Sequence, residues 1–322
     1  MNKHSQAVAA FPISRQPVTR ISAPDLRRDL DLTDDELAGL LDIALDIKQS
    51  PRDYAHALAG KYIGLLFEKA SLRTRLTFEL AIKQLGGDSV FSEGPIGARE
   101  PIKDVARNLD RWVNGIVART FSQDTIEELA HWSAVPVINA LSDLYHPCQV
   151  LADVLTLKER FGDFAGLKLA FCGDGNNVAH SLMLTCTRLG IDFAIATPHG
   201  YEPNAEIVAQ ADGLAAVSGA ALQLTDDPAE ALDGAHAVYT DVWTSMGQEK
   251  EAVRRRKAFA GYQVNDALFA LARPDAVFMH CLPAHREEEV TDSVIEHSRS
   301  LVFDQAENRL HAQKALLLMM LG

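Results

Sequence analysis

Short apolar runs alternate with amphipathic helical stretches along most of the chain, and this alternation is the feature that most limits its fold. The apolar runs cover residues 62–67, 88–91, 115–118, 135–139, 167–172, 193–196, 221–224, 237–239, 276–279 and 301–303. Strands that alternate with helices predict parallel sheets covered by helices. We therefore predict an α/β fold with two doubly wound parallel-sheet domains.

The domain organisation follows from the length of the chain and from one uninterrupted helical stretch. A chain of 322 residues is expected to form two domains, since a domain typically takes about 150 residues. The stretch 150–161 contains no turn signal and is closed by a glycine, so we read it as the connector. We expect a loosely ordered tail over 1–22, a first domain over 23–150 and a second over 151–304. The hydrophobic helix predicted over 305–322 is expected to pack back on the first domain.

Charge and cysteine content exclude several classes of protein. The chain has 31 Lys and Arg against 44 Asp and Glu, and its net charge of -13 argues against nucleic acids and anionic membranes as main partners. No apolar run approaches the ~20 residues of a membrane-spanning helix. The four cysteines contain no CxxC pair and no secretory leader is recognised. We therefore expect a cytoplasmic protein without a disulfide framework or a zinc knuckle.

Polar residues that directly follow the apolar runs are the candidates for a functional site, because ligands of open parallel sheets bind beyond the carboxyl ends of the strands. In chain order these residues are Ser71, Arg73, Thr74, Arg75, Arg119, Thr120, His146, Gln149, Asn176, Asn177, Asp241, Ser245, His280, Cys281 and Arg309. Both halves of the chain contribute to this set. We therefore expect the active site in the cleft between the two domains.

The turn that contains Ser71, Arg73 and Arg75 lies where a helix is predicted to begin. Free backbone N–H groups, the helix dipole and bidentate guanidinium donors at such a turn favour a phosphate or a similar dianion. A solvated basic turn paired with Glu68 and Glu79 is an equally open reading of this segment alone.

His146 and Arg119 each end an element at the predicted sheet edge. A lone histidine is more often structural, but a histidine and an arginine that converge at one edge suit an oxygen that gains negative charge in a transition state. Cys281 could be a nucleophile, a pocket-lining thiol or a bland buried cysteine. The nucleophile is disfavoured because neighbouring residues on a strand point to opposite faces, so His280 cannot be its base.

A glycine-rich turn, Gly173-Asp174-Gly175, resembles the start of a dinucleotide-binding fingerprint. Val178 occupies its third small position, and the following strand ends in Thr197-Pro198 without the acid that would bind a ribose. These departures argue against a nicotinamide dehydrogenase. The sequence also contains no Walker lysine motif, no HExxH and no metal-spaced cluster.

Six blocks of residues together resemble the ornithine branch of the carbamoyltransferases, and the resemblance extends from about Leu30 to the end of the chain. The blocks are Ser71-Leu72-Arg73-Thr74-Arg75, Arg119-Thr120, His146-Pro147-Cys148-Gln149, Gly173-Asp174-Gly175-Asn176-Asn177, Asp241-Val242-Trp243-Thr244-Ser245-Met246-Gly247 and His280-Cys281-Leu282-Pro283. Each block is weak evidence alone, whereas all six in this order are highly specific.

The resemblance implies that the chain transfers the carbamoyl group of carbamoyl phosphate to the δ-amino group of L-ornithine, giving citrulline and phosphate. No cofactor and no metal are implied, and the assembly is expected to be a homotrimer or a multiple of trimers. The residues implied for carbamoyl phosphate are Ser71, Leu72, Arg73 and Thr74 around the phosphate, Arg119 and His146 at the carbamoyl oxygen, Gln149 at its amide, and Arg309 at the anion site. The residues implied for ornithine are Leu141, Asn177, Asp241, Ser245, Met246, Cys281 and Leu282. Arg119, His146 and Cys281 are the implied catalytic residues.

This sequence departs from the family pattern at Ala70, Leu72, Pro95 and Ala140. The family glutamine at the position of Pro95 reaches a neighbouring subunit's phosphate site, and a proline cannot make that contact. Arg99 or Lys103 would have to replace that donor, or carbamoyl phosphate would bind less tightly. Two alternatives stay open: transfer to another amine, such as an acylated ornithine, putrescine or aspartate, and a catalytically idle relative with a binding role.

Overall fold

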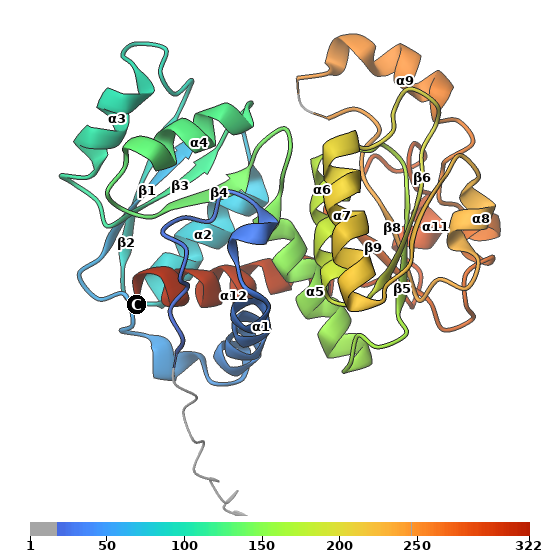
Figure 1. The fold of residues 1–322 in the computed structure, drawn as a ribbon, viewed down its shortest axis with the longest axis horizontal. Helices are drawn as coiled ribbons and strands as arrows, with labels where there is room; N and C mark the ends of the chain where they lie inside the picture. The colour runs from blue at the N-terminus through green and yellow to red at the C-terminus, as the bar shows by residue number, and fades with distance from the viewer. Residues whose placement is uncertain (1–17, 246) are drawn as a thin grey trace, which may run out of the picture.

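The computed structural model describes residues 18–245 and 247–322, so most of the predicted tail and Met246 lie outside the described residues. The first half forms a parallel sheet in the order β2-β1-β3-β4 (Figure 1). Its strands are β1 (Tyr62–Phe67), β2 (Asp88–Glu93), β3 (Gly115–Arg119) and β4 (Val137–Leu141).

Helices cover both faces of this first sheet. On one face, α3 (Ile102–Leu109) and α4 (Gln123–Trp132) pack on alternate side chains such as Leu66, Ile116 and Ala118. The opposite face belongs to a hydrophobic core shared with α2 (Leu72–Gln84) and α1 (Asp34–Gln49). The short helices η1 (Asp29–Asp31) and η2 (Pro51–Tyr54) flank α1. The alternation of side chains along each strand therefore builds two hydrophobic layers.

The second half forms a parallel sheet in the order β7-β6-β5-β8-β9. Its strands are β5 (Lys168–Cys172), β6 (Asp192–Ala196), β7 (Leu222–Thr225), β8 (Ala237–Thr240) and β9 (Val277–His280). One face packs against α6 (Asn177–Arg188) and α7 (Ala205–Ser218). The other packs against α8 (Pro228–Leu232), α10 (Asp266–Phe269) and α11 (Asp292–Ile295), while η3 (Glu249–Glu251) and α9 (Ala252–Ala258) follow β8. The predicted pair of parallel α/β sheets is confirmed.

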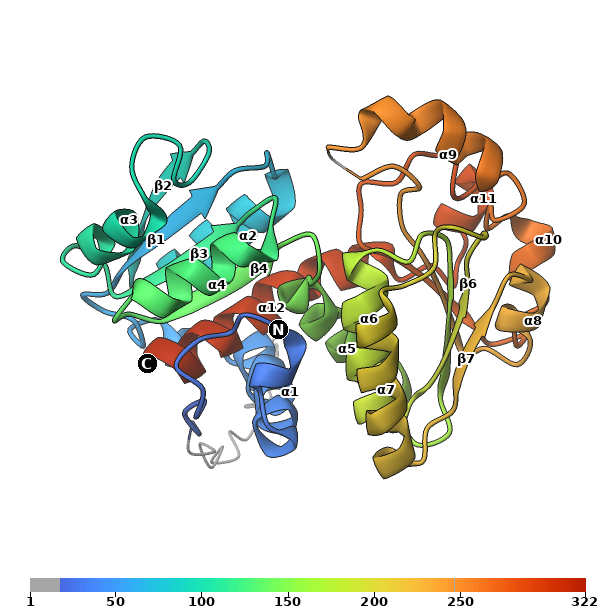
Figure 2. The ribbon, with the colours of Figure 1, turned by 45° about the horizontal axis from the view of Figure 1, so that its top comes forward.

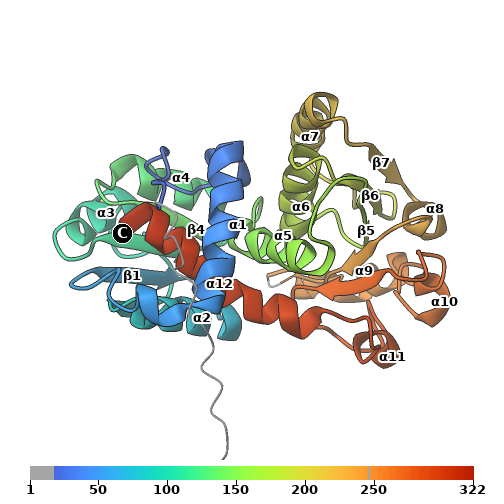
Figure 3. The same cartoon turned by 90° about the horizontal axis from the view of Figure 1, so that it is seen from below.

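Two long helices join the halves. The helix α5 (Pro147–Phe161) leads from the first sheet to the second, and α12 (Val302–Leu321) returns to pack against α1, α2 and α5 (Figures 1 and 2). Seen from below, α12 crosses α1 and continues beneath the first sheet (Figure 3). The two sheets are thus joined by one helix from the middle of the chain and one from its C-terminal part.

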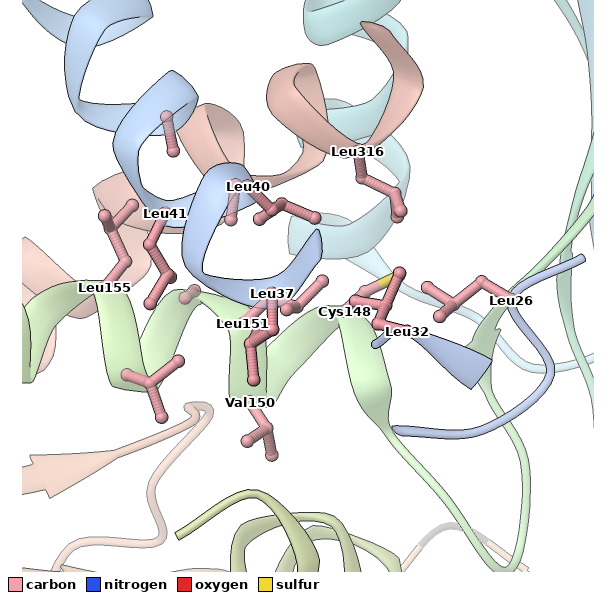
Figure 4. Packing of buried hydrophobic residues seen from close by; sticks show 14 of the residues in the cluster. Leu26, Leu32, Leu37, Leu40, Leu41, Cys148, Val150, Leu151, Leu155 and Leu316 are labelled. Atoms are coloured by element: carbon pink, nitrogen blue, oxygen red, sulfur yellow. The ribbon is translucent and has the colours of Figure 1, made fainter. Parts of the chain in front are cut away.

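Leucines on α1 and α5 face one another in the core that connects the halves (Figure 4). Leu37, Leu40 and Leu41 of α1 lie against Leu151 and Leu155 of α5. Each fully buried leucine contributes about 1.5–3 kcal/mol relative to an exposed one. The sequence places these leucines three or four residues apart, which is the spacing of one helix face.

One predicted strand, residues 301–303, is wrong. The chain makes a single bridge to β9, in which the Phe278 N–H donates to the Arg299 carbonyl and the Leu301 N–H to the Phe278 carbonyl. The helix α12 then begins at Val302, which is buried, while Phe303 points outward. A run of three apolar residues was too short to distinguish a strand from the first turn of a helix. The other predicted strands are all present.

Among the described residues, no helix has the length and apolar character needed to cross a membrane.

Candidate functional site

A cavity of about 500 Å³ lies at the carboxyl ends of the strands of both sheets. Every described residue that the resemblance implies for substrate binding lines it, whereas Met246 lies outside the described residues. The lining residues are Lys69, Ala70, Ser71, Leu72, Arg73, Thr74, Arg119, Leu141, His146, Gln149, Asn177, Val178, Asp241, Val242, Thr244, Ser245, Cys281, Leu282, Pro283, His285 and Arg309. The structure thus brings together side chains from nearly the whole length of the chain.

Four other residues selected from the strand ends do not line this cavity. Arg75 points away from it, pairing with Glu79 at 2.8 Å and covering the Phe91 ring. Thr120 and His280 are both buried. The Thr120 hydroxyl donates to the Ser122 carbonyl, and the His280 ring contacts Glu289. Asn176 is the N-cap of α6, and its Nδ2 donates a hydrogen bond to Asp241 Oδ2. Of the two acids expected to pair with a solvated basic turn, only Glu79 does so, with Arg75. Glu68 accepts hydrogen bonds from the N–H groups of Ile96 and Phe121.

The turn after β1 has the geometry of an anion site. Ser71 is the N-cap of α2 and accepts a hydrogen bond from the Thr74 N–H at 3.2 Å. Arg309 of α12 reaches across to donate to the Thr74 hydroxyl at 2.5 Å. Leu72, the first residue of α2, lines the cavity although the residue is 71% exposed. The backbone N–H groups of such a turn attract a phosphate.

The arginines of this cavity carry uncompensated positive charge. Arg119 is only 6% exposed, and its Nε has no hydrogen-bond partner in the described structure, as is also true of Arg309 Nε. Burial and the charge of Arg309 lower the pKa of Arg119 to about 10. Burial also lowers the pKa values of Arg73 and Arg309. Buried cations without a partner are costly, so this end of the cavity is built for an anion.

His146 is buried beside these arginines at the start of α5. Its backbone N–H donates to Ser181 Oγ at 2.9 Å, and that hydroxyl donates to Asp29 Oδ2 at 2.6 Å. Burial together with Arg309, Arg119 and Lys69 lowers the pKa of His146 well below its usual value. The ring is therefore neutral near pH 7 and can offer one N–H to an oxygen in the cavity.

A second part of the cavity wall, at Asp241, is acidic and accepts hydrogen bonds. Cys281 Sγ donates to Asp241 Oδ1 at 3.0 Å, and Asn176 Nδ2 donates to Asp241 Oδ2 at 2.8 Å. Asn177 Nδ2 donates to the Ser142 carbonyl at 2.6 Å, which fixes its amide at the cavity wall. A carboxylate and a thiol at this part of the wall suit an amine.

Cys281 is held as a neutral thiol. Burial and the neighbouring Asp241 raise the pKa of Cys281 well above its usual value. We expect its alkylation by iodoacetamide at pH 8 to be at least about tenfold slower than that of a free cysteine, because each pKa unit removes tenfold of the thiolate. Asp241→Asn is expected to accelerate the reaction. Peptide mass spectrometry with Cys281→Ser as the blank measures this, and labelling as fast as that of glutathione would contradict it.

Among the described residues, His285, Glu288 and Glu289 form one group of potential metal ligands, and Asp241, His280 and Cys281 form a second. The side-chain donor atoms of the second group lie within 4.8 Å of one another. Hydrogen bonds within the protein already engage these atoms. His280 Nδ1 accepts from the Leu282 N–H at 2.8 Å, and its Nε2 lies 3.3 Å from Glu289. Cys281 and His280 thus have separate partners, as expected from their neighbouring positions on a strand.

Sequence reasoning missed Lys69, which lies 4.7 Å above the Phe121 ring and lines the cavity. Burial and Arg119 lower the pKa of Lys69. Its place directly before the predicted anion turn was a usable signal. Thr244 and His285 were missed too, and each lies close in sequence to a predicted residue.

A second cavity, of about 440 Å³, adjoins the first and shares Lys69, Asn177 and Ser245 with it. A buried ion pair stands at its wall: Arg255 Nη1 donates to Asp174 Oδ2 at 2.8 Å and to the Trp243 carbonyl at 3.0 Å. This pair ties α9 to the loop after β5 and to the segment that carries Ser245. Nothing in the sequence signalled that these two charges meet.

Two family models together match most of the chain. The model described as aspartate/ornithine carbamoyltransferase, carbamoyl-P binding domain, matches residues 25–159. The model described as aspartate/ornithine carbamoyltransferase, Asp/Orn binding domain, matches residues 165–320.

Individual relatives agree. The ornithine carbamoyltransferase of Gloeobacter violaceus is 51% identical over 93% of this chain and 96% of its own length. The solved structure of the Pyrococcus furiosus ornithine carbamoyltransferase has a TM-score of 0.91 at 47% identity, covering 95% of this chain and 99% of that one. An acetylornithine transcarbamylase complexed with acetylcitrulline is 32% identical with a TM-score of 0.84, over 92% of this chain and 99% of that one. With both family models and near full-length relatives in agreement, the chain belongs to the aspartate/ornithine carbamoyltransferase family.

Proposed function

We propose that the chain transfers the carbamoyl group of carbamoyl phosphate to the δ-amino group of L-ornithine, giving L-citrulline and phosphate. One observation carries this proposal: a single cavity is lined both by buried arginines with an unpartnered Nε and by the Asp241–Cys281 pair. A dianionic carbamoyl donor that bound at the arginines and an amine that bound at Asp241 would share this cavity. Such positioning of two reactants can supply a large part of the rate enhancement.

The first half, residues 23–150 with the 305–322 segment, is proposed to bind carbamoyl phosphate. The turn of Ser71, Leu72, Arg73 and Thr74, completed by Arg309, holds the phosphate in this proposal. Arg119 and His146 donate to the carbamoyl oxygen, and Gln149 contacts the carbamoyl nitrogen. The uncompensated arginine charge and the free first turn of α2 support these roles.

The second half, residues 151–304, is proposed to bind ornithine. Asn177, Ser245 and Met246 take the α-amino and α-carboxylate groups, while Leu141 and Leu282 contact the methylene chain. Asp241 and Cys281 hold the δ-nitrogen with its lone pair toward the carbamoyl carbon. The position of the Asp241 carboxylate at the cavity wall supports this arrangement.

In the reaction, the δ-nitrogen lone pair forms the new C–N bond and the carbamoyl oxygen gains negative charge. Arg119 and His146 face that oxygen, and fixed donors in a buried site stabilise developing charge more than water does. The C–O bond to phosphate then breaks, phosphate departs toward Arg73 and Arg309, and the nitrogen passes its proton to the departing phosphate. Each step uses only side chains of this chain and the two substrates.

The experiment measures citrulline formation by the purified chain from carbamoyl phosphate and L-ornithine, beside putrescine, N-acetyl-L-ornithine and aspartate. We expect turnover selective for ornithine. Asn177→Ala is expected to raise the ornithine KM about 10–100-fold, because a hydrogen bond to a charged group contributes about 1.5–3 kcal/mol. Faster turnover of putrescine, unaffected by Asn177→Ala, would favour transfer to another amine. Activity with none of the four amines would favour an idle relative.

The assembly is proposed to be a homotrimer. One face of α2 exposes Leu72, Leu76 and Leu80 to 71%, 45% and 45%, and the neighbouring edge strand β2 exposes Val90 to 62%. Contiguous exposed apolar side chains of this kind mark protein contacts.

The double variant Leu76→Glu, Leu80→Glu is expected to be monomeric by light scattering. Val217→Glu, at an equally apolar site that is 89% exposed, is the control and should leave the mass unchanged. A monomeric wild type, or a double variant that stays trimeric, would contradict this proposal.

A reducing, cytoplasmic location is proposed from the cysteines. All four, Cys148, Cys172, Cys186 and Cys281, are unpaired thiols. Disulfides are rare in reducing compartments, and free buried thiols are compatible with such a compartment.

A further inference from the structure

Asp153 is a buried acid in the middle of α5, one turn after Gln149. It is 0% exposed, and no lysine or arginine forms an ion pair with it among the described residues. Three neutral donors surround its carboxylate instead. Gln149 Nε2 and Gln305 Nε2 lie 2.8 Å and 2.7 Å from its Oδ1, and the Tyr239 hydroxyl lies 3.1 Å from its Oδ2. A buried acid kept in this way needs an explanation, since an apolar residue would cost less.

The direction of each hydrogen bond in this group follows from one backbone donor. The His280 N–H can only donate, and it does so to Gln305 Oε1 at 2.9 Å. The Gln305 amide must therefore present its Nε2 to Asp153, so Oδ1 of Asp153 acts as an acceptor. When Oδ1 carries no proton, its second contact must also be a donor, so the Gln149 amide presents Nε2 to Asp153.

The consequence appears at the other end of the Gln149 amide. Its Oε1 is buried and has no partner in the described structure, and Gln149 lines the cavity beside Arg119 and His146. A carbonyl oxygen in that position can only accept a hydrogen bond. The group that lies against it must carry an N–H or an O–H, or the buried oxygen stays unsatisfied.

We propose that Asp153 is a positioning residue, held by Gln305 and Tyr239, that orients the Gln149 amide. In this orientation the site selects a carbamoyl NH2 over the methyl group of an isosteric acyl phosphate. This inference rests on the proposed function. The NH2 donates to Gln149 Oε1, whereas a methyl group of the same size leaves that oxygen without a partner. Sites built around such a hydrogen bond reject analogues that lack the donor far more strongly than analogues that differ by one methylene.

The arrangement does not depend on the charge of Asp153. Burial raises the pKa of Asp153 to about 7, so both protonation states are accessible near neutrality. Both amides contact Oδ1, while Oδ2 faces the Tyr239 hydroxyl, which can accept as well as donate. A proton on Oδ2 therefore leaves the orientation of the Gln149 amide unchanged. For the same reason Asp153→Asn can keep its oxygen toward the two glutamines and its NH2 toward Tyr239.

The test compares the affinities of two stable probes by titration calorimetry: phosphonoacetamide and its methyl-ketone isostere, acetonylphosphonate. Wild type is expected to bind the amide about 100-fold more tightly than the ketone. Asp153→Ala is expected to reduce that ratio to within about threefold, and Asp153→Asn to restore most of it. Thr156→Val is the matched control: it removes another buried α5–α12 hydrogen bond, from Asn308 at 3.0 Å, one turn from Asp153. It is expected to lower Tm without changing the ratio.

Each outcome bears on the inference. Equal binding of the two probes by wild type overturns it, as does a ratio that survives Asp153→Ala. Loss of the ratio in Asp153→Asn also overturns it, because charge rather than orientation would then be responsible. Asp153→Leu, which fills the site with carbon, replaces the alanine variant if that variant does not fold. A parallel citrulline assay on wild type separates failure of the proposed function from failure of this inference.

Discussion

Replacing Arg119 with methionine is expected to lower kcat for citrulline formation by about 10²–10³-fold, the loss that follows removal of one preorganised donor to a developing oxyanion. Arg119 ends β3 and is almost fully buried with an unpartnered Nε, so its charge is available to the carbamoyl oxygen. Burial makes that charge costly unless an anion pairs with it. We therefore expect Arg119→Met to keep or raise Tm while it removes activity.

The control for this prediction is Arg160→Met. Arg160 is an exposed arginine near the end of α5, where it covers Phe161 outside the cavity. The Arg160→Met variant should retain the wild-type kcat. Steady-state kinetics and thermal unfolding on the three proteins separate the chemical effect from loss of fold. A kcat of Arg119→Met within threefold of wild type would remove Arg119 from the proposed chemistry.

Breaking the buried Arg255–Asp174 pair is expected to have the largest effect on stability. Arg255→Met leaves Asp174 buried without its partner, and removing one member of such a pair costs about 3–5 kcal/mol in the free energy of unfolding. Burial already raises the pKa of Asp174 to about 6 despite the arginine beside it. The variant also releases the Trp243 carbonyl, two residues before Ser245, so the KM for ornithine should rise while the KM for carbamoyl phosphate changes little.

A double-mutant cycle with Asp174→Asn isolates the pair. The double variant should be more stable than Arg255→Met alone, since no unpaired carboxylate remains, and a coupling energy above about 1 kcal/mol is expected. Urea unfolding measures it. Additive effects of the two substitutions would show that the pair does not stabilise this segment.

Much of the fold was predictable because short apolar runs and the geometry of parallel sheets leave few alternatives. The same geometry located most of the cavity: Arg119 ends a strand, Asp241 and Cys281 each follow one, and the strand ends of both sheets meet at one cavity. Boundaries were less certain, as the short run at 301–303 shows, because three apolar residues pack equally well in the first turn of a helix.

The supporting contacts could not be predicted, because they join residues far apart in the chain. Asp29 and Ser181 meet behind His146, and Arg255 meets Asp174 across the second half. Such pairs leave no local pattern. Asp153 did leave one: an acid within an otherwise apolar helical run indicates a buried polar role, although its partners become visible only in the structure.

The central claim is that one cavity holds both substrates at the same time, with the carbamoyl carbon between Arg119 and Asp241. Titration calorimetry with an ornithine whose δ-nitrogen carries a phosphonoacetyl group tests it directly. We expect one molecule bound per chain, more tightly than phosphonoacetamide or ornithine alone, with affinity lost both in Arg119→Met and in Asn177→Ala. Affinity that depends on only one of these two residues would show that the two halves do not bind their substrates in a common cavity.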